Sequence, residues 1–154
     1  MVEQARDRGL GQPIVGGDGY DTPRLAGDGG ATAEGVVFTT HAGVYGDPSP
    51  LAAAFLTTFA ADYGQPPPSV FAALGYDAVL LMADAIGRAG SLDPIAVRDA
   101  LAATDGFRGV TGAVAYPPGE RVPVKDVALV WVESGRFVLL REGAPRRVPP
   151  PERR

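Results

Sequence analysis

The sequence predicts an α/β fold that is incomplete by itself. Short apolar stretches come first, three helical segments follow between residues 49 and 104, and strand-like stretches come last. This order of elements indicates an α/β arrangement. A chain of 154 residues is long enough for one domain with a substantial core. Two short early strands, however, cannot form a self-sufficient sheet, so we expect part of the fold to be missing.

The first forty residues predict a helix and two strands. The stretch "VEQARDRGLG" (2–11) is typical of the last two turns of a helix with a glycine stop. "PIVGG" (13–17) predicts a short buried strand, and the β-branched "GVVFTTH" (35–41) predicts a second one. The Gly/Ala-rich stretch between them (25–35) shows no strong period and is expected to be a connection. A domain rarely opens with the end of a helix, so we expect the chain to be cut from a longer frame.

The next segment predicts an amphipathic helix that ends at Gly64. Ser49 is a typical N-cap, and Pro50 at the first helical position fits its fixed φ angle. Apolar side chains recur every four residues and should face a core. They are Leu51, Phe55, Phe59 and Tyr63.

Two more helices are expected after the stiff "QPPP" connection (65–68). The segment from Ser69 to Gly90 is apolar nearly all round, which predicts the most buried helix of the assembled molecule. It contains no apolar run that approaches the roughly 18 residues of a membrane span. The third helix begins with Asp93 as cap and Pro94 behind it.

The last third of the chain predicts strands. "GVTGAVAY" (109–116) reads as one strand before a Pro/Gly turn, and "DVALVWVESGRFVLL" (126–140) reads as a hairpin around Ser134-Gly135. Residues 141–154 contain many prolines and arginines, so we expect a disordered tail.

Composition excludes several classes of partner. The net charge is −4 and the only lysine is Lys125, whereas a nucleic-acid-binding protein needs a basic stripe. No basic amphipathic helix is present for an anionic membrane. The chain has no cysteine, hence no disulfide or thiolate metal site. Its N-terminus lacks the apolar core of a signal peptide. We expect a small-molecule or protein partner and no cofactor or metal.

The stretch "VGGDGYDTP" (15–23) carries the chemistry that the sequence offers. Its acids oppose a phosphate loop, and position twelve counted from Asp18 is Gly29, where a calcium loop needs a glutamate. A carboxylate between glycines at the end of a strand can bind an ammonium group, with Tyr20 as a wall. The alternative is a solvated turn in which Asp18 bonds its own backbone.

Catalytic groups are scarce. His41 is the only histidine, and no Gly-x-Ser-x-Gly motif places a nucleophile beside it. Asp77 and Asp84 lie seven residues apart on one helix and should share a face. Such acids usually bond neighbouring backbone or reach solvent. We therefore expect no enzymatic activity.

Five segments together resemble one family. They are "PIVGGDGYDTPRL", "AEGVVFTTH", "FAALGYDAVLLMADAIGRAGS", "AVRDALAAT" and "FRGVTGAVAY". In this order they resemble the branched-chain amino-acid-binding proteins, which are substrate-binding components of ABC importers with the type I periplasmic-binding fold. The resemblance covers residues 2 to about 140 and corresponds to the C-terminal portion of a longer, two-lobed protein.

The resemblance implies roles for a few residues. Asp18, with its neighbours Gly19 and Tyr20, matches the loop whose acid holds the ligand's α-ammonium group. Phe71 matches a wall of the side-chain pocket. Tyr76 matches an aromatic that packs, and His41 matches a hinge position without chemistry.

The resemblance also implies a division of the chain. Residues 1–40 correspond to the end of lobe two with the ligand-facing loop, and residues 41–116 to a crossover and the second part of lobe one, with three helices. Residues 117–140 correspond to closing strands, before the tail at 141–154. The implied partners are an amino-acid-like ligand and an ABC permease, in the periplasm or outside the cell. Uncovered apolar faces and sheet edges predict that the fragment self-associates.

Three functions remain open at this point. The first is a solute-binding protein for branched-chain or related amino acids or amides. The second is a ligand-sensing regulatory or receptor domain of the same fold, for which an appended effector segment would be expected. The third is a small α/β enzyme, which would need a nucleophile and a base that the sequence does not offer.

Overall fold

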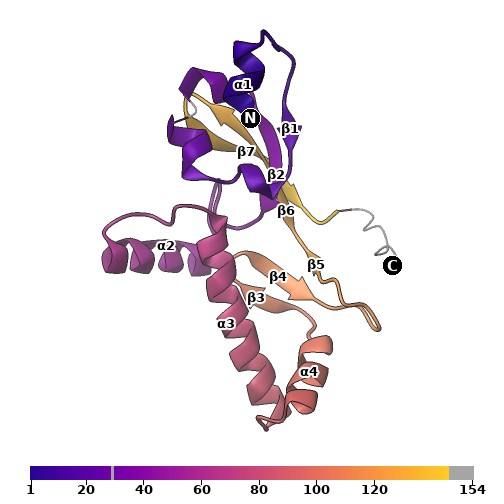
Figure 1. The fold of residues 1–154 in the computed structure, drawn as a ribbon. Coiled ribbons are helices and arrows are strands. Elements are labelled where there is room, and N and C mark those ends of the chain that lie inside the picture. Colours follow the sequence, from indigo (N-terminus) through magenta and orange to yellow (C-terminus); the bar gives the residue numbers. More distant parts are fainter. Residues whose placement is uncertain (29, 146–154) are drawn as a thin grey trace.

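The computed structural model describes residues 1–28 and 30–145, and these form two bodies joined at a narrow junction (Figure 1). Residues 1–41 and 127–143 form what we call the sheet body, and residues 50–125 form the helix body. The chain crosses between them twice, through residues 42–49 and through Asp126.

The sheet body contains one mixed sheet with short helical segments around it. Its strands are β1 (Val15–Gly16), β2 (Val37–His41), β6 (Val127–Glu133) and β7 (Arg136–Gly143). They are ordered β1-β2-β6-β7. β1 and β2 are parallel, and the other neighbours are antiparallel. The remaining elements are α1 (Val2–Asp7), η1 (Asp18–Tyr20), η2 (Arg24–Asp28) and η3 (Gly30–Ala33).

The predicted hairpin is confirmed, because β6 and β7 pair around Ser134-Gly135. Both turn residues have positive φ angles, 51° and 70°. This is the backbone that a two-residue hairpin turn requires and that glycine adopts readily.

Alternating residues of the sheet form the core of this body. Ala128, Val130 and Val132 of β6 are fully buried, and Phe38 of β2 lies among them. Phe38 meets Phe137 of β7 edge to face, with ring centroids 5.1 Å apart. Such alternation is the period-2 pattern of a sheet with one buried face.

The helix body contains three helices and a small antiparallel sheet. The helices are α2 (Pro50–Tyr63), α3 (Val70–Ala89) and α4 (Pro94–Ala102). The strands β3 (Phe107–Gly109), β4 (Gly112–Ala115) and β5 (Val124–Lys125) are paired in that order. The stretch expected to form one strand is thus the second half of a β3–β4 hairpin.

The predicted helix caps are confirmed. The Ser49 hydroxyl accepts a hydrogen bond from the Ala52 amide at 3.2 Å, and the Asp93 carboxylate accepts one from the Ala96 amide at 3.0 Å. α2 and α3 end at Gly64 and Gly90, which are both left-handed. These boundaries were predictable because each depends on residues within one turn of the helix end.

α3 is only partly buried in the single chain, which does not test the prediction made for the assembled molecule. Its buried residues are Val70, Ala73, Asp77 and Ala85, while Val79 is 69% exposed. The α2 stripe is likewise only partly buried, since Leu51 and Tyr63 are exposed. α3 contacts α4 and β3, and its Tyr76 packs on Phe55 of α2, while part of its surface, including Val79, stays exposed.

The expectation that no segment has the length and apolarity of a membrane span was also wrong. α3 has 20 residues and meets both criteria by length and composition alone. Its middle residue Asp77 is buried against the β3–β4 turn by hydrogen bonds. These contacts make α3 an integral helix of the helix body.

Other local expectations need correction. β1 is not buried, because Val15 is 72% exposed at the edge of the sheet. The connection after β1 forms short helical turns (η2 and η3). β7 extends to Gly143, so residues 141–143 of the expected tail are in a strand, and residues 146–154 lie outside the described residues.

Two adjacent residues of the first crossing attach it to opposite bodies. Val44 packs against the helix-body cluster around Phe55, and Tyr45 packs against the sheet-body core. Just before them, a Cβ atom on Gly43 would lie 2.4 Å from the Val110 carbonyl oxygen. The crossing therefore requires glycine where it passes the β3–β4 turn.

Candidate ligand-binding site

The candidate site begins with the turn that follows β1. The amides of Tyr20 and Asp21 donate to the carbonyls of Gly17 and Asp18, at 3.1 and 2.9 Å. These bonds form the short helix η1 and leave the Asp18 side chain 57% exposed. Within the described residues, this carboxylate accepts no hydrogen bond from its own turn. The structure thus does not show the self-bonded turn that was the alternative.

His41, the last residue of β2, lies next to Asp18. Its Nε2 atom is 3.7 Å from Asp18 Oδ2, longer than a hydrogen bond but within ion-pair distance. On the other side, its ring meets Phe71 edge to face, with centroids 6.2 Å apart. Phe71 lies in the first turn of α3 and is 45% exposed. The imidazole therefore links the two sequence-predicted residues Asp18 and Phe71 at the junction of the two bodies.

Nearby charges and burial set the charge state of His41. Partial burial lowers the pKa of His41, and the Lys125 ammonium lowers it further, against the carboxylates of Asp18 and Asp21, which raise it. The balance favours the neutral imidazole at neutral pH. Neutral His41 leaves the Asp18 carboxylate without a fixed counter-ion.

A second carboxylate, Asp21, holds the Asp18 turn in place and was not selected from the sequence. Asp21 is 1% exposed and accepts hydrogen bonds from the Thr40 hydroxyl at 2.7 Å and the Tyr45 hydroxyl at 2.6 Å. The pKa of Tyr45 lies above its ordinary value, mainly because the hydroxyl is buried and also because it donates to Asp21. Asp21 thereby ties the turn to β2 and to the crossing. Its partners are 19 and 24 residues away, so no local pattern could reveal them.

Lys125 is the second residue that the sequence did not indicate. It is the last residue of β5, next to the crossing at Asp126, and its ammonium group donates to the carbonyl oxygen and the hydroxyl of Thr111. Burial lowers the pKa of Lys125, partly offset by Asp77, Asp126 and Glu142, which raise it. The ammonium group of Lys125 is bound to the β3–β4 turn through Thr111. Its positive charge disfavours the protonated imidazole and so lowers the pKa of His41.

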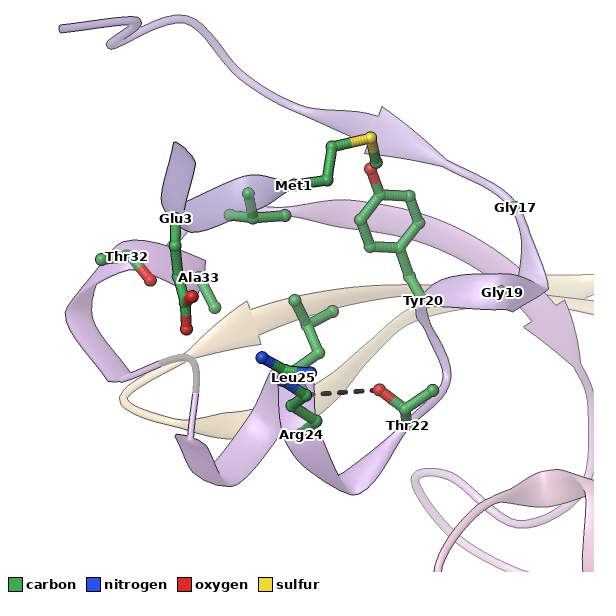
Figure 2. Close-up of a pocket in the computed structure, with 11 residues that line it drawn as sticks. Met1, Glu3, Gly17, Gly19, Tyr20, Thr22, Arg24, Leu25, Thr32 and Ala33 are labelled. Atoms are coloured by element: carbon green, nitrogen blue, oxygen red, sulfur yellow. Dashed lines mark hydrogen bonds between the residues drawn. The ribbon is translucent and has the colours of Figure 1, made fainter. Parts of the chain in front are cut away.

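Gly19 and Tyr20 lie on the side of the sheet body that faces the N-terminus. The Tyr20 ring packs against Phe38, with centroids 6.5 Å apart, and it occupies the space where a side chain on Gly16 would lie. Figure 2 shows Tyr20 beside Met1, on the wall of a hollow between α1 and the segment 17–25. Asp18, His41 and Phe71 do not line this hollow, whose volume is about 490 Å³.

The four sequence-predicted site residues thus form two groups. Asp18 and Phe71 meet through His41 at the junction, whereas Gly19 and Tyr20 line the hollow beside the N-terminus. Tyr20 as a wall for a ligand at Asp18 remains a prediction. Its packing on Phe38 gives it a structural role in either case.

The two acids of α3 lie in different environments. Asp77 is buried and accepts hydrogen bonds from the amides of Val110 and Thr111, at 2.6 and 2.8 Å. Asp84 forms an ion pair with Arg88 at 2.8 Å, with both side chains well exposed. Both therefore have structural partners, and no group of three or more metal-binding side chains occurs among the described residues.

Comparison with known proteins identifies related folds. A family model described as "Periplasmic binding protein" matches residues 1–136. The leucine-binding protein LivK of Thermotoga maritima is 33% identical with a TM-score of 0.81, and the alignment covers 92% of this chain and 40% of LivK. No curated protein sequence matches the chain.

Two further solved structures are complexes with small molecules. The branched-chain amino acid transporter substrate-binding protein LivJ of Streptococcus pneumoniae, in complex with isoleucine, is 32% identical. Its TM-score is 0.77, over 94% of this chain and 40% of LivJ. An ABC-transporter solute-binding protein of R. palustris, in complex with benzoate, is 25% identical with a TM-score of 0.75, over 94% and 39% of the two chains. The chain therefore spans about 40% of the length of the structures that it resembles.

Proposed function

The chain belongs to the periplasmic binding protein family and has a partial type I fold, and from that premise we propose that it contributes half of an amino-acid-binding site. The ligand is a branched-chain or related amino acid, held at the junction between the two bodies. The chain performs no catalysis. In this role it is part or all of the substrate-binding component of an ABC importer. It acts in the periplasm or outside the cell and delivers the ligand to a permease.

The observation that carries this proposal is the position of Asp18 and Phe71 on either side of His41. Asp18 offers an exposed carboxylate with no fixed partner, which suits an ammonium group. Phe71 offers an exposed aromatic surface, which suits an aliphatic side chain. The two belong to different bodies, so a ligand that touches both is expected to hold the junction closed.

Calorimetry with L-leucine tests the Asp18 part of the proposal. Asp18→Asn keeps the size of the side chain and removes its charge, so the affinity should fall at least tenfold, corresponding to about 1.5–3 kcal/mol for a charged hydrogen bond. Asp84→Asn is the matched control, because Asp84 is also an exposed carboxylate but lies on α3 with Arg88 as its partner. It should bind leucine as the parent chain does.

N-acetyl-leucine adds a second control, since it lacks the ammonium group. It should bind the parent chain weakly, and Asp18→Asn should not weaken it further. Phe71→Ala should lower leucine affinity less than Asp18→Asn and change the preference between leucine and smaller amino acids. If Asp18→Asn binds leucine as tightly as the parent chain, Asp18 is only a turn residue and the proposal is wrong.

A further inference from the structure

His41 occupies the centre of the candidate site, where the family resemblance implied a hinge without chemistry. Its imidazole is 33% exposed and lies between an exposed carboxylate and an exposed aromatic ring. A ligand that touches both Asp18 and Phe71 must therefore pass against His41. The side chain is also the one titratable group within ion-pair distance of Asp18 in the part of the chain that the structure describes.

The distance between the two groups defines two states of the pair. At 3.7 Å, neutral His41 forms no hydrogen bond with Asp18, and the carboxylate stays available. A protonated imidazole would be a cation next to Asp18, at the place where a ligand ammonium group would bind. Two cations cannot both neutralise one half-exposed carboxylate at close range without repelling each other.

The charged groups around His41 decide which carboxylate a protonated imidazole can pair with. Asp18 comes from η1 and Asp21 from the residue that follows it, and both favour the protonated imidazole. Lys125, at the second crossing, opposes protonation, and so does burial. Asp21 is already bonded to Thr40 and Tyr45, so Asp18 is the carboxylate free to pair with the imidazolium.

We infer that His41 is a specificity-determining residue of the site, which contacts the ligand between Asp18 and Phe71 and, once protonated, competes with the ligand's ammonium group for Asp18. The inference rests on the proposed function for its ligand part, while the Asp18–His41 pair itself does not depend on any ligand. Acidification should then release an amino acid, and it should favour a carboxylate ligand without an ammonium group.

The first experiment measures the pair without a ligand. Because His41 is the only histidine, a single imidazole signal can be followed by NMR from about pH 8 to about pH 5. The pKa of His41 should be lower in Asp18→Asn than in the parent chain, because the variant lacks the carboxylate that favours the imidazolium. Asp84→Asn should leave it unchanged. An unchanged titration in Asp18→Asn would overturn the pair and the inference.

The second experiment adds the probe L-leucine over the same pH range. In the parent chain, affinity should fall toward tenfold per pH unit below the pKa of His41, since binding must release one proton. In His41→Gln, which keeps a polar side chain of similar reach, affinity should change little over the same pH range. Equal pH dependence in the two proteins would overturn the competition.

Benzoate has a carboxylate and no ammonium group, so its affinity should change with pH in the opposite direction to that of leucine. Its binding to the parent chain should strengthen on acidification, and His41→Gln should remove that gain. If neither protein binds leucine at any pH, the proposed function and the ligand part of the inference both fail. The NMR comparison would still decide whether Asp18 and His41 form a pair, so the two failures are distinguishable.

Discussion

In the sheet body, Val36, Phe38 and Val130 have no exposed surface, whereas Tyr63, Val79 and Ile95 in the helix body are 68%, 69% and 60% exposed. The difference lies in what covers each apolar face. Val2, Leu25 and Ala33, from α1, η2 and η3, close over the sheet and complete its core. The helix body has only a small cluster of four buried residues.

The uncovered apolar surface of the helix body forms a groove between α2 and α3. Phe55, Phe59, Tyr63, Tyr76 and Val79 are among the residues that line its volume of about 460 Å³. The aromatic rings among them also contact one another. For example, the ring centroids of Phe59 and Tyr63 are 4.4 Å apart. A contiguous exposed apolar surface of this kind usually marks a contact that the working protein makes. The sheet body thus covers its own apolar core, whereas the helix body leaves an apolar face uncovered.

The largest expected effect comes from the core of the sheet body. Phe38→Ala should lower the free energy of unfolding by about 3–5 kcal/mol, because it leaves a cavity among fully buried side chains. The matched control is Phe71→Ala in the helix body, where the ring is 45% exposed and truncation should cost much less. Urea unfolding followed by circular dichroism measures both. Equal losses would show that the two bodies do not differ as described.

The next effect concerns the interior of the helix body, which depends on a polar contact. Asp77→Ala would leave the buried amides of Val110 and Thr111 without their acceptor, and the cost should be about 3 kcal/mol. Asp84→Ala removes an exposed ion pair and should change stability by less than about 1 kcal/mol. Hydrogen exchange should also accelerate at the Val110 and Thr111 amides in Asp77→Ala. Unchanged exchange there would contradict the assigned role of Asp77.

The smallest effect on stability is expected at the groove, where association should change instead. We expect the chain to self-associate through this face at roughly tens of micromolar. Val79→Ser should leave the unfolding free energy within about 0.5 kcal/mol and weaken association. Val15→Ser is the control, because Val15 is similarly exposed in the sheet body. A monomeric parent chain in sedimentation experiments would exclude this use of the groove.

Sequence reasoning predicted the fold well where the cause of structure is local. The Ser49 and Asp93 caps, the glycine ends of α2 and α3, and the Ser134-Gly135 turn all depend on residues within a few positions. Resemblance to a family then supplied the overall architecture, which the partial type I fold confirms.

Burial was predicted poorly for β1 and for the apolar stripe of α2, and the physical reason is the same for both errors. Apolar periodicity reports which side chains would gain from being covered, but it does not report whether a covering layer exists. Hence the apolar stripe of α2 leaves Leu51 and Tyr63 exposed in the single chain. The same holds for Val15 at the sheet edge, which has the composition of a core strand and no layer over it.

At the candidate site, the carboxylate of the Asp18 turn could be recognised from the sequence alone. A carboxylate between glycines at the end of a strand could be recognised from nine residues, because its backbone and its charge are local properties. Only the tertiary structure decided which groups meet there. Asp18, His41 and Phe71 are brought together by the pairing of β1 with β2 and by the start of α3, and Asp21 finds Tyr45 only because the crossing folds back on the sheet body. Contacts between residues tens of positions apart are set by packing of whole elements, so no short pattern in the chain could specify them.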